Sequence, residues 1–218
     1  MKDVAAIVLA AGQSRRMGHF KPLLPFGDRT VVDCCIDNLR CGGAESVVVV
    51  VGHNAVDLKQ HLKASDVIFA LNPAPDSAMS VSVVCGVREL PSTAKAILIT
   101  PVDHPAVSPT VVARIIDSWQ EGARMVVPTW EGRGGHPILI DASLRDELLK
   151  LDPDRGLRRL FESNPNSVRR LAVDSPYIAR DMDTWDDYVL LHKDVFGVLP
   201  RHPFDRSEPE QHRTPETN

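Results

Sequence analysis

A short loop near the N-terminus combines glycines and cations in a pattern that suits phosphate. It follows the apolar run 4–10 and contains Gly12, Arg15, Arg16, Gly18 and Lys21. Glycines let backbone N–H groups approach an anion closely, and the cations add mobile positive charge. Five residues separate the two glycines and HFKP follows the second, so neither a P-loop nor a GxGxxG fingerprint is present. A solvated basic turn is the alternative interpretation.

Two aspartates far apart in the chain could supply oxygen ligands to a metal. Asp103 lies in ITPVDHPAV, after an apolar run, and Asp183 lies in ARDMDTWDDY, before a helical pattern. Mg²⁺ prefers oxygen and is commonly held by one or two carboxylates together with substrate phosphates. The alternatives are structural, because Asp103 could be a turn residue and Asp183 could be the N-cap of its own helix.

The other reactive residue types indicate little chemistry. The four cysteines form no CxxC pair and no Cys/His cluster with zinc spacing, and we expect them to be reduced and buried: Cys34, Cys35, Cys41 and Cys85. No serine or cysteine has a recognisable His/Asp partner arrangement, so the pattern does not indicate covalent catalysis.

Apolar runs and helical patterns alternate along the chain. Strands are predicted over 4–10, 46–52, 67–70, 96–100, 125–128, 136–140 and 168–173. Helices are predicted over 30–40, 54–63, 80–90, 108–119, 141–151, 156–163 and 183–196, with Asn54 and Ser108 as N-caps.

This alternation predicts an α/β fold, a three-layer α/β/α sandwich around a mostly parallel, Rossmann-like sheet. Such sheets bind ligands beyond the carboxyl ends of their strands, where the basic loop and Asp103 would lie. We expect one domain over 1–198 and a disordered tail over 199–218, which is rich in Pro, His, Glu and Arg.

The segment LAAGQSRRMGHFKPLLPFG resembles the LAAGxSxRMGxxKxLLP signature of the MobA/MocA-like nucleotidyltransferases. The match is gapless and covers Leu9, Ala10, Ala11, Gly12, Ser14, Arg16, Met17, Gly18, Lys21, Leu23, Leu24 and Pro25. In that family the segment binds the nucleoside triphosphate. The LAAG opening is closer to the cytidylyl branch than to the guanylyl branch.

The resemblance implies roles by position. The backbone of Ala10, Ala11 and Gly12, following Leu9, would border the base. Arg16 and the backbone from Gly12 to Gly18, which includes Ser14, would hold the β- and γ-phosphates, and Lys21 would reach the α-phosphate. Arg15 is placed with the nucleotide too, although it could simply face water.

The resemblance also implies the metal and base residues. VDHP and MDTWDDY resemble the family's xDxP and DxDT segments, which makes Asp103 and Asp183 the metal ligands, with Asp181 a weaker neighbour. NPAPDSAMSVSV resembles a segment that lines the pyrimidine, with candidates Asn72, Met79, Ser80 and Ser82. Ser80 and Ser82 could instead cap the next helix.

The acceptor side carries a weaker signal. GRGGHPILI resembles a family segment whose glycines permit close approach to a ligand, and His136 could contact the acceptor. A lone histidine is more often structural. His104 stands where the cofactor enzymes often have Gln or Met, which leaves the identity of the acceptor open.

Together these features predict a nucleotidyltransferase that uses Mg²⁺, with Mn²⁺ as an alternative, and releases pyrophosphate. Lys21, Arg16 and Asp103 would be its catalytic residues. The donor would be CTP and the acceptor molybdopterin cofactor phosphate, with a molybdoenzyme of the xanthine dehydrogenase type as a candidate recipient. The alternatives are a sugar- or polyol-phosphate nucleotidyltransferase and a non-catalytic maturation partner that carries the cofactor.

Composition bears on which partners and which cellular location we expect. The net charge of −4 argues against nucleic acid as a partner. No apolar run reaches the roughly 18 residues of a membrane helix, and the N-terminus does not resemble a signal peptide. We therefore expect no membrane association and a cytoplasmic location.

Overall fold

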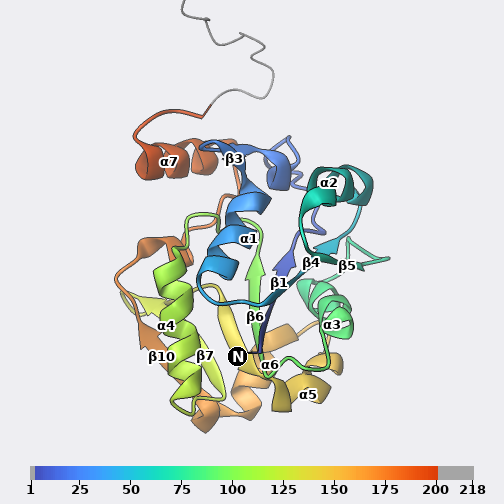
Figure 1. Cartoon of the computed structure of the whole chain (residues 1–218), viewed down its shortest axis with the longest axis vertical. Coiled ribbons are helices and arrows are strands. Elements are labelled where there is room, and N and C mark those ends of the chain that lie inside the picture. The colour runs from blue at the N-terminus through green and yellow to red at the C-terminus, as the bar shows by residue number, and fades with distance from the viewer. Residues whose placement is uncertain (1–2, 201–218) are drawn as a thin grey trace, which may run out of the picture.

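The computed structural model describes residues 3–200 as a sheet covered by helices on both faces (Figure 1). Its strands are β1 (Val4–Leu9), β2 (Pro25–Phe26), β3 (Arg29–Thr30), β4 (Ser46–Val51), β5 (Ile68–Leu71), β6 (Ala96–Pro101), β7 (Met125–Trp130), β8 (Arg133–Gly134), β9 (Ile138–Asp141) and β10 (Val168–Ala172). Its α-helices are α1 (Val31–Cys41), α2 (Ala55–His61), α3 (Met79–Glu89), α4 (Pro109–Gln120), α5 (Arg145–Leu149), α6 (Gly156–Ser163) and α7 (Trp185–Phe196).

Short 3₁₀ helices and a small hairpin complete the chain. The 3₁₀ helices are η1 (Lys21–Leu23), η2 (Leu62–Ala64), η3 (Ala142–Leu144), η4 (Pro165–Ser167) and η5 (Pro176–Ala179). Strands β2 and β3 pair with each other as an antiparallel hairpin outside the main sheet.

The main sheet is mixed but mostly parallel, with the order β10-β7-β9-β6-β1-β4-β5 and β8 paired to β7. Strands β6, β1, β4 and β5 are parallel to one another, and β10 is parallel to β7. Strand β9 runs antiparallel between β6 and β7. The predicted three-layer α/β/α fold is confirmed.

The central strands are apolar throughout because both of their faces are covered. In β1, Val4, Ala6 and Val8 join one apolar cluster, whereas Ala5 and Ile7 join the other. The first cluster receives apolar residues from α1, α2, α4 and α7, and the second from α3, α5 and α6. Figure 1 shows α1 and α4 in front of the sheet.

Most predicted elements lie within two residues of the observed ones, and the differences have local causes. The predicted helix 141–151 is divided into η3 and α5, with Asp141 capping the first by accepting from the N–H of Ser143. Ser108 caps α4 as predicted, by accepting from the N–H of Val111, whereas the side chain of Asn54 makes no capping bond.

The cysteines differ in exposure. Cys35 is buried, Cys34 and Cys85 are half-buried, and the prediction of burial is wrong for Cys41, which is exposed on the last turn of α1. Burial raises the pKa of the Cys34 thiol to about 11, so this thiol remains protonated at neutral pH.

Helix α7 lies beyond the carboxyl ends of the central strands, beside the β2–β3 hairpin (Figure 1). The hydroxyl of Tyr188 donates to the carbonyl of Pro25, and the N–H of Gly27 donates to Nε2 of His192 at 3.3 Å. These contacts join the end of the chain to the segment that follows the basic loop. The predicted tail lies outside the described residues except for residues 199 and 200.

Candidate active site

The basic loop leaves β1 beside the end of β6. In the parallel register Leu9 is opposite Pro101, and the N–H of Val102 donates to the carbonyl of Leu9 at 3.1 Å. Asp103 therefore follows β6 directly next to the start of the loop. Placement at the carboxyl ends of neighbouring parallel strands is where α/β sheets bind ligands.

Three residues fix the course of the loop. Gly18 and Ser14 have positive φ values of 72° and 52°, so the chain turns back on itself twice. Met17, between them, is buried in the core on the α1 side of the sheet. The Ser14 hydroxyl accepts from the N–H of Lys21 at 3.1 Å. This bond closes the loop and sets the start of η1.

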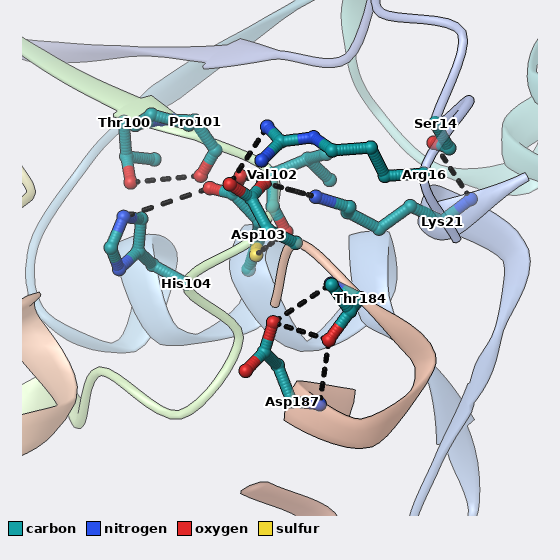
Figure 2. A network of polar contacts seen from close by, with 12 residues as sticks. Ser14, Arg16, Lys21, Thr100, Pro101, Val102, Asp103, His104, Thr184 and Asp187 are labelled. Atoms are coloured by element: carbon teal, nitrogen blue, oxygen red, sulfur yellow. Dashed lines mark hydrogen bonds and ion pairs between the residues drawn. The ribbon is translucent and has the colours of Figure 1, made fainter. Parts of the chain in front are cut away.

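Lys21 is the point at which the distant segments meet (Figure 2). Its Nζ lies 3.4 Å from Oδ2 of Asp103 and 3.3 Å from Oδ1 of Asp183. Its side chain is only 9% exposed, so this ammonium is largely removed from water. A buried cation is costly unless it is paired, and here two carboxylates pair with it.

Asp183 lies just before α7 and is placed by the start of that helix. The N-cap of α7 is Thr184, whose hydroxyl accepts from the N–H of Asp187, while Asp187 accepts from the N–H of Thr184. The hydrogen bond from the Thr184 hydroxyl lowers the pKa of Asp187. The interpretation of Asp183 as an N-cap is therefore wrong, and its carboxylate is available to Lys21 and, at 2.8 Å, to Arg16.

The converging side chains border a cavity of about 320 Å³. Most of the predicted nucleotide and metal residues line it: Leu9, Ala10, Ala11, Gly12, Ser14, Arg15, Arg16, Lys21, Met79, Ser82, Asp103 and Asp183. Both signs of charge are present on its walls, with cations from the basic loop and carboxylates from the far side. Such a cavity suits an anion that brings its own metal ion.

Four predicted residues are not among those that line this cavity: Gly18, Asn72, Ser80 and His136. Asn72 is buried and donates from Nδ2 to the hydroxyl of Ser82 at 2.9 Å, so it supports a cavity residue from behind. The hydroxyl of Ser80 donates to the carbonyl of Pro153. Neither serine caps α3, whose N-cap is Ala78.

His136 lies behind the site, next to His104, with the two ring centroids 5.2 Å apart. Burial, followed by the neighbouring charge of His104, lowers the pKa of His136 to about 4. The ring is therefore neutral at pH 7. Gly135, its neighbour, packs closely against the backbone of Ile178 and not against the cavity. A Cβ on Gly135 would lie 2.2 Å from the carbonyl oxygen of Ile178.

The sequence interpretation missed part of the cavity wall. Pro75 and Ser77, from the loop between β5 and α3, line the cavity, as do Pro22, Pro101 and Val102. In the same loop Asp76 pairs with Arg15 at 3.1 Å and with His53 at 3.3 Å. The cluster of proline, aspartate and serine over 73–77 was the available signal, since such a cluster indicates a loop beyond a strand.

A model of the MobA-like NTP transferase domain matches residues 6–170, which is more than half of the chain. The chain belongs to the MobA-like NTP transferase family. The match includes the basic loop and Asp103, while Asp183 lies beyond it.

Curated relatives of this MobA-like chain carry two kinds of name. Nicotine blue oxidoreductase of Paenarthrobacter nicotinovorans is 30% identical over 83% of this chain and 92% of the relative. Molybdenum cofactor cytidylyltransferase of Escherichia coli (strain K12) is 25% identical over 87% of this chain and 95% of the relative. The family is one of nucleotidyltransferases, whereas one of these two relatives is named for a different reaction.

Rv0371c from Mycobacterium tuberculosis H37Rv has a similar solved structure, with a TM-score of 0.77 at 29% identity over 87% of this chain and 97% of the neighbour. The same neighbour has also been solved in complex with manganese, and there the TM-score to this chain is 0.74.

The donor set of this chain fits a divalent cation. Asp103 and Asp183 present carboxylate oxygens to one point, and the Lys21 ammonium that lies between them shows that a positive charge is accommodated there. Hard oxygen donors with few protein ligands suit Mg²⁺ or Mn²⁺, with substrate phosphates completing the coordination. Within residues 3–200 no group of three or more His, Cys, Asp or Glu could hold a metal ion, so water or substrate oxygens would join these two carboxylates around the cation.

Proposed function

We propose that the chain transfers a nucleoside monophosphate from CTP to molybdopterin cofactor, with Mg²⁺ as the metal and pyrophosphate as the second product. The observation that carries this proposal is the meeting of Lys21 with Asp103 and Asp183 within 3.4 Å at the wall of one cavity. Binding of an anion alone needs cations, whereas carboxylates beside them indicate a metal-bound triphosphate.

In this reaction an oxygen of the acceptor phosphate attacks the α-phosphorus, the bond to the β-phosphate breaks, and pyrophosphate leaves. A phosphate monoester has a second pKa of about 6, so at pH 7 the attacking group is largely ionised already. No general base is required, which agrees with the side chains that line the cavity. Catalysis then consists of placing the reactants in line and neutralising charge.

Each residue at the cavity wall would contact a different part of the metal-bound triphosphate. Lys21 would contact the α-phosphate, and Arg16, Arg15 and the loop backbone from Gly12 to Gly18, with Ser14, would hold the β- and γ-phosphates. Asp103 and Asp183 would hold Mg²⁺, which would supply positive charge to the phosphate oxygens. Lys21 pairs with both carboxylates in this structure. With nucleotide bound, its ammonium would pair with a phosphate, and the two carboxylates would be free to hold Mg²⁺.

The base would lie against the start of the basic loop. Leu9, Ala10 and Ala11 line the cavity there together with Ser82. The Ser82 hydroxyl already accepts from Asn72, so its proton is free to point toward the base. Ser80 would not contact the base, and its hydrogen bond to Pro153 would only help to hold α3 in place. The LAAG opening and the E. coli cytidylyltransferase relative favour CTP over GTP.

The acceptor assignment rests on the names of the molybdenum cofactor relatives. His136 is neutral at pH 7 and can offer an acceptor a hydrogen bond but no charge. Its imidazole Nδ1 is buried and makes no hydrogen bond within the part of the chain that the structure describes. A molybdoenzyme of the xanthine dehydrogenase type would receive the product.

A panel of CTP, GTP and ATP with purified molybdopterin cofactor and Mg²⁺, scored by product mass and pyrophosphate release, tests the proposal. We expect the cytosine dinucleotide form of the cofactor as the main product, and about 10³-fold less of it from the Asp103→Asn variant. Mn²⁺ should substitute for Mg²⁺. His61→Gln is a matched control, because His61 pairs with Asp33 at 2.8 Å on α1 and lines no part of the cavity.

Three other outcomes would contradict the proposal and identify its alternatives. Product from a sugar or polyol phosphate, but not from the cofactor, would indicate the other transferase class. Cofactor binding with no nucleotide affinity would indicate a maturation partner. The Paenarthrobacter relative raises an oxidoreductase as a further candidate, which a protein-dependent change in the absorbance of nicotine blue would reveal.

A further inference from the structure

A buried histidine beside Asp103 has no role in the reaction as described. His104 follows Asp103 directly and is only 8% exposed. It is not among the residues that line the 320 Å³ cavity, so a ligand in that cavity would meet Asp103 and not the histidine. Polar side chains are rarely buried without a partner, which raises the question of what this ring holds.

Each ring nitrogen of His104 faces an oxygen. Nε2 lies 3.6 Å from Oδ1 of Asp103, and Nδ1 lies 3.5 Å from the carbonyl oxygen of Tyr177 in η5 (Figure 2 draws the contact with Asp103). Imidazole has a nitrogen at either edge of a rigid ring; one of them donates in the neutral ring and both donate when the ring is protonated. His104 therefore spans the space between η5 and the carboxylate that follows β6.

The two oxygens of Asp103 have different surroundings. Oδ2 faces Lys21 at 3.4 Å, on the cavity side. Oδ1 is buried and makes no hydrogen bond within residues 3–200, and Nε2 of His104 is the polar atom beside it. An unpaired buried carboxylate oxygen is costly, so a small approach of the ring that completes this hydrogen bond is favoured.

We propose that His104 is a positioning residue: it holds Oδ1 of Asp103 from behind, so that Oδ2 is presented to the metal and to Lys21. This inference rests on the proposed metal site. Carboxylates that ligate metals are themselves held by hydrogen bonds from outside the coordination sphere, and the loss of such a bond typically costs 10–100-fold in metal affinity or activity.

The segment behind His104 is built rigidly enough for this role. The N–H of His136 donates to the carbonyl of Ile178 at 2.8 Å, and the absence of a side chain on Gly135 permits this close approach. Ile178 is fully buried in η5, next to Tyr177. The ring of His136 also packs beside that of His104. The residues after β8 thus fix the carbonyl that orients His104.

The test is a titration of Mn²⁺ alone, followed by electron paramagnetic resonance of the free ion, at one fixed pH. His104→Phe keeps a ring of similar size but has no donor, and we expect a 10–100-fold weaker affinity. His104→Gln places an amide N–H near the position of Nε2, and we expect an affinity within about threefold of the unsubstituted chain. His61→Gln, which alters a His–Asp pair remote from the cavity, should change nothing.

Unchanged Mn²⁺ affinity in His104→Phe would overturn the proposal, as would equal losses in His104→Phe and His104→Gln. If His104→Phe does not fold, His104→Asn replaces it, because its shorter amide reaches only toward Tyr177 and should lose affinity where Gln does not. Absence of Mn²⁺ binding in the unsubstituted chain would overturn the metal site and this proposal together. Mn²⁺ binding without transfer from CTP would overturn the proposed function and leave the role of His104 standing.

Discussion

Two pairs of aspartates in this molecule behave in opposite ways. Asp33 in α1 and Asp187 in α7 each form a capping box with a threonine three residues earlier, Thr30 and Thr184. Asp103 and Asp183 instead pair with Lys21, across 82 and 162 residues of chain. Each member of the first pair has partners in its own helical turn, with His61 as a further partner of Asp33, whereas the second pair meets Lys21 only after the whole sheet has formed.

The difference shows in what each carboxylate can still do. Burial would raise the pKa of Asp33, but hydrogen bonds from Thr30 and His61 outweigh it and lower the pKa. Its oxygens are thus committed to the helix start. Asp103 retains one oxygen toward the cavity, and Asp183 lines the same cavity. The capping aspartates stabilise helices, and the cavity aspartates are available to a ligand.

The largest expected effect comes from exchanging one aspartate of each pair for asparagine. Asp103→Asn should reduce pyrophosphate release by about 10³-fold, because a metal ligand loses its charge, while thermal unfolding remains cooperative. Asp33→Asn should leave turnover within about twofold and cost about 1 kcal/mol of stability. Equal turnover in the two variants, measured by coupled pyrophosphate assay, would remove the distinction between the pairs.

Lys21→Met tests the pairing between the cavity carboxylates and their cation. The substitution removes the ammonium that pairs with Asp103 and leaves Arg16 as the cation that pairs with Asp183, so it should lower the free energy of unfolding by about 2–3 kcal/mol in EDTA. Mn²⁺ should restore much of this loss, since it replaces the missing positive charge. Thermal denaturation with and without Mn²⁺ measures both effects. If Mn²⁺ does not change the stability of this variant, the carboxylates do not bind the metal.

The stability contributions of His136 and of the capping aspartates should depend on pH over different ranges. His136, behind the site, has a pKa of about 4 in the folded chain against an ordinary value of 6.5, so folding favours its neutral form. Its contribution to stability is complete above about pH 6.5 and is lost as the pH falls toward 4, amounting to about 3 kcal/mol. The lowered pKa values of Asp33 and Asp187 imply a loss that begins only near and below 4.

Urea denaturation between pH 7 and pH 3 resolves these windows. His136→Phe should flatten the decline above pH 4.5 and leave the acid limb in place. If the free energy of unfolding declines equally above pH 4.5 in His136→Phe and in the unsubstituted chain, groups other than His136 cause the decline.

The two capping boxes give the smallest and sharpest contrast. Thr30→Ala and Thr184→Ala should each cost about 1 kcal/mol of stability, because each removes the same N-cap. Only Thr184→Ala should also weaken Mn²⁺ binding, by a few-fold, since Asp183 directly precedes this cap. The comparison fails if Thr30→Ala weakens Mn²⁺ binding as much.

Local patterns in the sequence predicted what local physics decides. The valine run of β4 and the Ser-Pro start of α4 indicated their elements within a residue or two. The hairpin β2–β3 is local, but its two-residue strands are too short to show a strand pattern. The antiparallel direction of β9 was not predictable in this way, because it depends on pairing with the distant strand β6. The family signature located Lys21 and Asp103, but composition and spacing alone left them as a basic turn and a turn aspartate.

The roles of two buried residues near the site, Asn72 and His104, could not be predicted because they depend on packing between elements. Asn72 looked like a base contact, but its position under Ser82 depends on how α3 packs against the end of β5. The part played by His104 likewise depends on η5, which lies 73 residues further along the chain. The Asn72–Ser82 contact spans ten residues but depends on the packing of α3, and the His104–Tyr177 contact joins residues that no short stretch of sequence contains.

The central claim is that Lys21, Asp103 and Asp183 surround a single metal-bound triphosphate. Calorimetric titration of CTP in Mg²⁺ and in EDTA, on the unsubstituted chain and on Asp183→Asn, tests it most directly. The account predicts at least tenfold tighter CTP binding in Mg²⁺, with this coupling lost in Asp183→Asn. Equal CTP affinity in Mg²⁺ and in EDTA for the unsubstituted chain would contradict it.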